Sequence, residues 1–126
     1  MPIEILVIDD EKIVGQRLKA SLEKDGYSVE TFTEPLQALE RIREKKFDVV
    51  VTDIRMDNLD GITMLEETRK KSEKTKVVII TGYATLEIAR EALTKGAFDF
   101  ISKPFKLKEI REAILKAVEA LQLESS

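Results

Sequence analysis

Short apolar runs alternate along the chain with longer stretches in which apolar residues recur every three or four positions. Short runs of this kind are typical of strands, and the longer spacing is typical of helices that bury one face. The sequence therefore predicts five strands that alternate with five helices. We expect the strands at 3–8, 28–32, 47–53, 77–80 and 98–102, and the helices at 11–24, 35–45, 62–71, 86–95 and 106–123.

The apolar runs are of two kinds, and the difference predicts the order of the strands. Residues 5–8, 49–51 and 77–80 are continuously apolar, which suits strands buried on both faces of a parallel sheet. Residues 28–32 and 98–102 alternate between apolar and polar, which suits edge strands. We therefore expect an α/β fold with a single doubly wound, flavodoxin-like parallel sheet of five strands in the order 2-1-3-4-5.

The spacing within the helices predicts which side chains face the core. In the second helix we expect Leu36, Leu39 and Ile42 to point inward. Thr33 is the expected N-cap of that helix, and Pro35 suits its first turn. The last helix carries more apolar residues than one inward stripe uses, so we expect it to contact a second copy or to continue as a signalling helix. Its expected inward stripe is Leu107, Ile110, Ile114, Ala117 and Leu121, and the apolar residues expected at a partner contact are Leu115, Val118, Leu121 and Leu123.

Composition narrows the chemistry that this fold can carry. The chain has 126 residues, which fits one domain spanning 1–126, and it contains neither cysteine nor histidine. Disulfides, thiol nucleophiles, serine–histidine catalysis and histidine-based metal sites are therefore excluded, so a bound metal would be a hard ion such as Mg²⁺ held by oxygen. The net charge of −3 argues against direct binding of nucleic acid. No apolar run approaches the roughly 20 residues of a membrane span, so we expect a cytoplasmic protein with no membrane partner.

Reactive side chains stand where four of the five apolar runs end. They are Asp9 and Asp10 after the first run, Asp53 after the third, Thr81 after the fourth and Lys103 after the last. The carboxyl ends of parallel strands meet at one edge of a sheet, so these groups should converge. Three carboxylates in one pocket repel one another unless a cation such as Mg²⁺ neutralises them. Asp53 is then predicted to act as a nucleophile toward phosphorus, with Lys103 and Thr81 binding the phosphoryl group.

With these residues in place, the chain resembles the receiver domain of bacterial two-component response regulators over essentially its whole length. The matching pieces are Asp9-Asp10, Asp53, Thr81-Gly82 and Lys103-Pro104-Phe105. Residues 81–85 and 97–100 are similar to receivers of nitrogen-regulatory, enhancer-binding regulators. Both a stand-alone receiver and the first domain of a larger regulator agree with the sequence.

The resemblance implies a phosphorelay function. Asp53 would accept a phosphoryl group from a sensor histidine kinase and so control an output domain or a downstream protein. Asp10, Asp53 and the backbone carbonyl of Arg55 would bind Mg²⁺, with assistance from Asp9. The chain would then be a phosphoacceptor rather than an enzyme, with only self-phosphorylation and self-dephosphorylation as activities.

The resemblance also implies roles for residues around the acceptor. Thr81 and Lys103 would contact the phosphoryl group, and Phe100 matches an aromatic switch position. The bond between Lys103 and Pro104 is expected to be cis, because a following proline makes that isomer accessible. The chain departs from the family pattern at Asp57, where proline usually stands four residues after the acceptor.

One expectation concerns two residues beside the site. Arg55 and Tyr83 lie two residues beyond Asp53 and Thr81, and both are large enough to shield the phosphoryl group from water and lengthen its lifetime.

Two surfaces are expected to meet partners. Ile13, Val14 and Arg17 of the first helix should form the kinase-docking surface, with Val14 also on the inward stripe of that helix. The fourth helix, the last strand and the last helix should form the output surface, which also suits a phosphorylation-dependent homodimer.

Two other functions would share this architecture. A phosphatase of the haloacid dehalogenase type also forms an aspartyl phosphate, but it would want a second acid two residues after the nucleophile, where this chain has Arg55. A nucleotide-binding module would want a glycine-rich phosphate loop after a strand, and no such loop is present. Both rank below the receiver.

Overall fold

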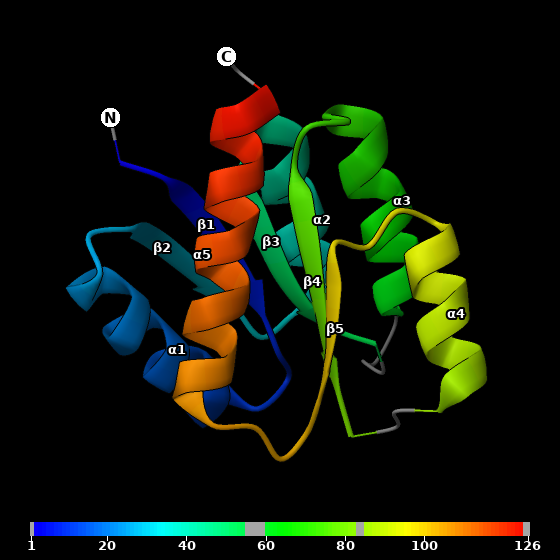
Figure 1. Cartoon of the computed structure of the whole chain (residues 1–126), viewed down its shortest axis with the longest axis horizontal. Coiled ribbons are helices and arrows are strands. Elements are labelled where there is room, and N and C mark those ends of the chain that lie inside the picture. The colour runs from blue at the N-terminus through cyan, green and yellow to red at the C-terminus, as the bar shows by residue number, and fades with distance from the viewer. Residues whose placement is uncertain (1, 55–59, 83–84, 125–126) are drawn as a thin grey trace.

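The computed structural model describes residues 2–54, 60–82 and 85–124, and in these ranges five strands alternate with five helices (Figure 1). The strands are β1 (Glu4–Ile8), β2 (Ser28–Phe32), β3 (Val49–Asp53), β4 (Lys76–Thr81) and β5 (Asp99–Ser102). The helices are α1 (Lys12–Lys24), α2 (Pro35–Glu44), α3 (Gly61–Lys71), α4 (Leu86–Thr94) and α5 (Leu107–Glu124). All ten predicted elements are present, and their boundaries shift by at most two residues.

The five strands form one parallel sheet in the order β2-β1-β3-β4-β5, as the two kinds of apolar run predict. The continuously apolar strands β1, β3 and β4 occupy the centre, and their valines and isoleucines are buried. The alternating strands β2 and β5 are the edges, where several side chains are only partly buried. Burial on two faces therefore decides which strand lies where.

Helices cover both faces of the sheet, and each face has its own core (Figure 1). On one face, Leu18 of α1 and Ile114 of α5 pack against alternate residues of the central strands such as Val7. On the other face, helices α2, α3 and α4 pack against the residues in between, among them Leu6 and Ile79. Successive strand residues point to opposite faces, so both helical layers draw on the same three strands.

Two expectations for α2 are wrong, one about its inward face and one about its N-cap. Leu36 is 53% exposed, because the buried stripe of the helix is Pro35, Ala38, Leu39 and Ile42. In a helix, the residue after Pro35 is rotated by about 100° away from that stripe. With Pro35 as the first helical residue, the N-cap is Glu34 and not Thr33, and no side chain caps this end.

In α5, the burial of several apolar residues differs from the expectation. Val118 is buried, and Leu121 packs against the core, so neither is available to a partner. Leu107, at the first position of α5, is 40% exposed instead of inward. Leu115 and Leu123 are exposed as expected, which leaves them for contacts outside the sheet.

Glycine ends two helices in the conformation that other residues avoid. Gly26 follows α1 with a φ of 92°, and Gly96 follows α4 with a φ of 102°. Both positions lie in the left-handed region, where a Cβ is disfavoured. The chain can therefore turn directly from each helix toward the next strand.

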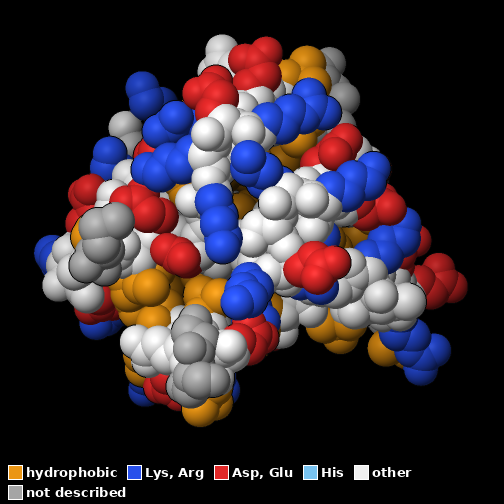
Figure 2. All heavy atoms as spheres, turned by 90° about the horizontal axis from the view of Figure 1, so that it is seen from above, with side chains coloured by type: hydrophobic (Ala, Val, Ile, Leu, Met, Phe, Trp, Pro, Cys, Tyr) orange, Lys and Arg blue, Asp and Glu red, His pale blue; other side chains and the backbone are white. Residues whose placement is uncertain are grey.

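Charges of both signs share the surface. At the end of the molecule where both termini lie, basic and acidic side chains are interspersed, with apolar side chains between them (Figure 2). This mixture matches the small net charge of −3. Among the helices that the structure describes, none combines the length and the apolar character needed to cross a bilayer.

Candidate functional site

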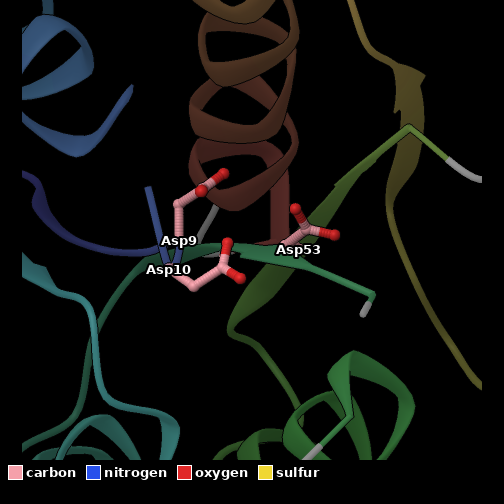
Figure 3. A group of neighbouring side chains, drawn as sticks. All are labelled: Asp9, Asp10 and Asp53. Atoms are coloured by element: carbon pink, nitrogen blue, oxygen red, sulfur yellow. The ribbon is translucent and has the colours of Figure 1, made fainter. Parts of the chain in front are cut away.

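The strand order brings the predicted reactive residues to one end of the sheet. Strands β1 and β3 are hydrogen-bonded neighbours, so Asp9, just beyond β1, lies beside Asp53 at the end of β3. Together with Asp10 they offer carboxylate oxygens that all lie within 4.8 Å of one another. Figure 3 shows the three carboxylates gathered beside the ends of these two strands. We call Asp9, Asp10 and Asp53 the acidic site.

The three acids differ in their exposure to water. Asp9 is 1% exposed and Asp53 is 5% exposed, whereas Asp10 lies at the surface. Burying a charged carboxylate is costly unless it is paired or hydrogen-bonded. The backbone N–H of Glu11 donates to Asp9 Oδ1 at 2.8 Å, which meets part of this requirement.

Lys103 supplies the cation that the acidic site needs. Its Nζ lies 2.7 Å from Asp53 Oδ2 and 2.8 Å from Asp9 Oδ2, and it is 3.5 Å from Glu11 Oε1. The residue follows β5, and its backbone N–H donates to the carbonyl of Thr81 at 2.8 Å. The bond from Lys103 to Pro104 is cis, as the sequence led us to expect. The amine thus lies between the ends of β1 and β3, although its strand is the far edge of the sheet.

Charge and burial shift the pKa values of the paired groups. Burial of Asp9 raises the pKa of its carboxyl, and this effect outweighs the opposing hydrogen bond and charge of Lys103. Burial would lower the pKa of Lys103, but its hydrogen bonds with Asp53 and Asp9 raise that pKa overall. Lys103 therefore remains an ammonium ion at neutral pH, because three carboxylates lie close to its amine.

Thr81 and Phe100 occupy neighbouring strands near the acidic site. Thr81 ends β4 and is fully buried. Phe100 lies on β5 and pairs with Ile79 of β4. Thr81 of β4 pairs with Ser102, two residues further along β5. Its ring is partly buried against the core that faces α2, α3 and α4. The two residues are therefore placed on adjacent strands, two positions apart along the sheet.

Gly61 is a residue at this site that sequence reasoning missed. It begins α3, and its N–H donates to the carbonyl of Ile54 at 2.7 Å. A Cβ at this position would lie 2.2 Å from the carbonyl oxygen of Asp53 and 2.7 Å from Ile54 Cα. The helix therefore approaches the backbone of Asp53 as closely as only glycine allows. In the sequence, Asp60-Gly61 gave only a turn signal, which does not distinguish a turn from a close contact.

The expected docking residues lie on α1 next to the acidic site. Ile13 is 57% exposed and Arg17 is also exposed, so neither side chain is buried in the core. Val14 is partly buried and packs against the core. The two lifetime residues, Arg55 and Tyr83, and the unusual Asp57 lie outside the described residues.

Comparison with known proteins identifies the family of this chain over nearly its whole length. A family model described as the response regulator receiver domain matches residues 5–115. The chain belongs to the response regulator receiver domain family. The transcriptional regulatory protein ZraR of Klebsiella oxytoca is 38% identical to this receiver over 124 residues, which are 98% of this chain. The same alignment covers only 28% of ZraR, so the receiver spans little more than a quarter of that relative.

Solved structures agree with the family and with the fold. The receiver domain protein from Methanospirillum hungatei JF-1, which is CheY-like, superposes with a TM-score of 0.94 at 29% identity, over 98% of this chain and 99% of the other. The beryllofluoride-activated NtrC4 receiver domain, solved as a dimer, gives a TM-score of 0.88 at 33% identity, over 94% and 98%. This receiver is thus a signalling domain of the phosphorelay type, and nothing supports the phosphatase alternative.

Proposed function

We propose that Asp53 accepts a phosphoryl group from the phosphohistidine of a sensor kinase. The observation that carries this proposal is the bridge of Lys103 between Asp53 and Asp9, at the end of the sheet where β1 and β3 meet. A carboxylate oxygen of Asp53 attacks phosphorus, the bond from phosphorus to the histidine nitrogen breaks, and an acyl phosphate forms. Water later attacks the same phosphorus, which releases phosphate and restores the carboxylate.

The neighbouring side chains favour this transfer. Lys103 gives a charge-assisted contact to the phosphoryl oxygens, and the Thr81 hydroxyl donates to them. The partial burial of Lys103, whose side chain is 17% exposed, strengthens its attraction for a phosphoryl group relative to a fully solvated amine. We infer that the chain carries out only its own phosphorylation and dephosphorylation, and that no other substrate is turned over.

The donor set of the acidic site fits Mg²⁺. Carboxylate oxygens are the ligands that this ion prefers, and three of them lie within 4.8 Å. Asp10 and Asp53 would hold the ion, with Asp9 assisting and a further oxygen expected from the backbone of Arg55. When bound, Mg²⁺ neutralises charge on the carboxylates and coordinates a phosphoryl oxygen.

The partners of this receiver follow from two surfaces. Ile13, Val14 and Arg17 of α1 are proposed to meet the kinase, because Ile13 and Val14 lie one turn from Asp9 and Asp10 and Arg17 lies one turn further along the helix. A groove of about 930 Å³ runs between α1 and the start of α5 and reaches Lys103, so a partner seated there would approach the acceptor. Its lining includes Val14, Leu18, Phe105 and Leu107, with Glu11, Arg17, Lys24 and Arg111 among its charged residues.

The output is proposed to leave through α4, β5 and α5. Thr81 moves toward the phosphoryl group, and Phe100 fills the space beside β4, which changes the surface that an output domain or a second copy meets. We further propose that residues 1–126 form one receiver domain, that it acts in the cytoplasm, and that it controls an output module in a longer protein or a separate one.

Mass spectrometry after incubation with acetyl phosphate tests the acceptor. We expect the wild-type protein to gain one phosphoryl group in the presence of Mg²⁺ and not after chelation. Asp53→Asn should gain none, while remaining folded, because the amide is nearly isosteric and relieves repulsion among the acids. Equal labelling of Asp53→Asn and the wild type would exclude Asp53 as the acceptor.

A further inference from the structure

Lys103 has a third carboxylate neighbour that the acceptor chemistry does not require. Glu11 Oε1 lies 3.5 Å from Lys103 Nζ, and both residues line the groove between α1 and α5. Its side chain is 61% exposed, in contrast to Asp9 and Asp53. The amine is therefore shared between two buried acids and one acid at the mouth of the site.

The conformation of Glu11 supports a role toward Lys103 instead of toward its own helix. Glu11 is the N-cap of α1 and has an extended backbone, with φ of −87° and ψ of 104°. Ser, Thr, Asp or Asn at this position would accept a hydrogen bond from the first turn and stabilise the helix. The side chain of Glu11 makes no such bond. A residue type that caps poorly thus occupies a capping position, and its carboxylate faces the amine.

Lys103 and a divalent cation would draw on the same carboxylates. Lys103 contacts Asp53 Oδ2 and Asp9 Oδ2, and both residues belong to the acidic site. Two cations held by the same pair of buried carboxylates would lie close together and repel each other. Binding of Mg²⁺ therefore favours withdrawal of Lys103 from at least one of its two buried partners. An ammonium ion that withdraws without a new partner would be left partly buried and unpaired.

We propose that Glu11 is a positioning residue that receives Lys103 when the ammonium withdraws from the acidic site. It already lies within ion-pair distance, so a small rotation of Lys103 exchanges one carboxylate for another. Glu11 then keeps the amine at the mouth of the site, where an incoming phosphoryl group meets it. This inference rests on the proposed function of the acidic site and adds a residue to it.

A double-mutant cycle on Mg²⁺ affinity tests the exchange. Mg²⁺ binding is measured by calorimetry and by amide shifts for the wild type, Glu11→Gln, Lys103→Met and the double variant. If Glu11 acts by receiving Lys103, Glu11→Gln weakens Mg²⁺ binding about two- to fivefold in the presence of Lys103, the range measured for exposed ion pairs. In the Lys103→Met background the same change has at most half that effect. Lys103→Gln replaces Lys103→Met if the latter does not give a folded spectrum.

Two outcomes would overturn the exchange. An equal loss of Mg²⁺ affinity in both backgrounds would mean that Glu11 acts only as a nearby charge. No loss in either background would mean that Lys103 needs no alternative partner. Glu23→Gln, an exposed acid at the far end of α1, is the matched control and should leave Mg²⁺ affinity unchanged. If the wild type itself binds no Mg²⁺, the proposed function fails, and this result is distinct from either outcome.

Glu11→Asp separates positioning from a structural role. Aspartate is a strong N-cap, so this variant should raise the melting temperature by roughly 2–5 °C. Its shorter side chain, engaged with the first turn of α1, should no longer reach Lys103, and Mg²⁺ binding should weaken as in Glu11→Gln. A merely structural residue would show stability and Mg²⁺ affinity rising or falling together, and that result would count against the proposal.

Discussion

At the scale of single residues, the position of Asp53 depends on the absence of a side chain at residue 61. The first turn of α3 packs directly on the backbone at the end of β3, and Gly61 is the point of contact. A methyl group there would have to displace the carbonyl of Asp53, because a gap of 2.2 Å is far inside van der Waals contact. Helix α3 therefore contacts the backbone of the acceptor, while Lys103 contacts its carboxylate.

Gly61→Ala should therefore impair phosphorylation more than it impairs folding. Displacing a reacting group by about 1 Å can slow a reaction on the order of 100-fold, whereas overpacking costs about 1–3 kcal/mol of stability. We expect acetyl phosphate to label this variant at least tenfold more slowly than the wild type, with the circular dichroism spectrum retained. Labelling at the wild-type rate would show that β3 can move without consequence.

Gly15→Ala is the matched control for that experiment. Gly15 lies inside α1, and a Cβ there would meet Thr31 Cβ at 3.6 Å, which is ordinary contact. Alanine is the better helix former, so this variant should gain about 0.5–1 kcal/mol of stability in chemical denaturation. Its rate of phosphorylation should equal that of the wild type.

The sequence predicts the reactive residues better than the residues that hold them. Asp9, Asp53 and Lys103 could be found because each follows an apolar run, and parallel strands carry such residues to one edge. Gly61 and Glu11 could not be found in the same way. Their contributions depend on how closely α3 approaches β3 and on which direction a side chain takes, and neither is encoded in a period or a spacing.

At the scale of elements, the edge strand β2 is held by an ion cluster. Arg41 of α2 contacts both oxygens of Glu30, at 2.8 and 3.1 Å, and Lys45 lies 3.1 Å from Glu30 and 2.5 Å from Glu4. Charged residues on an edge strand also hinder pairing with another sheet. The pKa of the Glu30 carboxyl is lowered, mainly by the hydrogen bond from Arg41 and further by Lys45, against the opposing effect of burial.

This cluster should make part of the stability depend on pH. Because the folded pKa of Glu30 is below its unfolded value, its contribution is complete above the unfolded pKa of about 4.3 and is lost as the pH falls through the folded pKa. Glu30→Gln should be less stable than the wild type in urea at pH 7, and the difference should shrink in acid. A difference that is constant from neutral to strongly acidic pH would show that Glu30 contributes through packing alone.

The surface of α1 next to the acidic site is the element on which kinase docking can be tested. Arg17 is exposed and lies one turn from the exposed Ile13. Reversal of a charge at the centre of an interface opposes a complementary partner, so Arg17→Glu should slow phosphotransfer from the cognate kinase by roughly tenfold or more. Labelling by acetyl phosphate should be unaffected, because that small donor does not use the surface.

The charge reversal needs a control on another face. Lys70→Glu places the same change on α3, where Lys70 is also exposed. This variant should accept the phosphoryl group from the kinase at the wild-type rate. If Arg17→Glu and Lys70→Glu behave alike with the kinase, α1 is not the docking element.

Element types and strand order could be predicted because burial dictates them, but helix rotation could not. Leu36 and Ala38 are both apolar, but the buried stripe of α2 includes Ala38 and leaves Leu36 out. Val118 shows the opposite case, since it lies outside the expected inward stripe of α5 and is nevertheless buried beside Ala117. The number of apolar residues on a helix therefore overstates its partner surface.

At the scale of the whole molecule, the two helices of the proposed output surface are attached very differently. Helix α5 buries five residues, and ion pairs tie it at both ends, with Arg111 to Asp25 at 2.7 Å and Lys76 to Glu124 at 2.5 Å. Of the residues of α4, all of which the structure describes, only Ala92 is buried. Few buried contacts mean a low cost of local movement. A change at Thr81 should therefore appear mainly as a change in α4, with α5 as the fixed side of the surface.

We predict that this receiver self-associates through exposed leucines of α4 and α5. Leu93 of α4 is 51% exposed, and Leu115 of α5 is exposed to the same extent, so both are available to a second copy. The related NtrC4 receiver, in its beryllofluoride-activated form, is a dimer. We expect light scattering to show that beryllofluoride shifts this receiver from monomer toward dimer. Leu93→Asp should weaken that dimer at least about tenfold, because a carboxylate would have to be buried in the interface.

Leu36→Asp gives this experiment its control, because Leu36 is a leucine of nearly equal exposure on α2. It lies on a helix outside the proposed output surface, so the variant should dimerise like the wild type. If both aspartate variants weaken association equally, the effect is a general one of surface charge. If the wild type stays monomeric with and without beryllofluoride, the exposed leucines of α4 and α5 serve an output partner and not a second copy of this receiver.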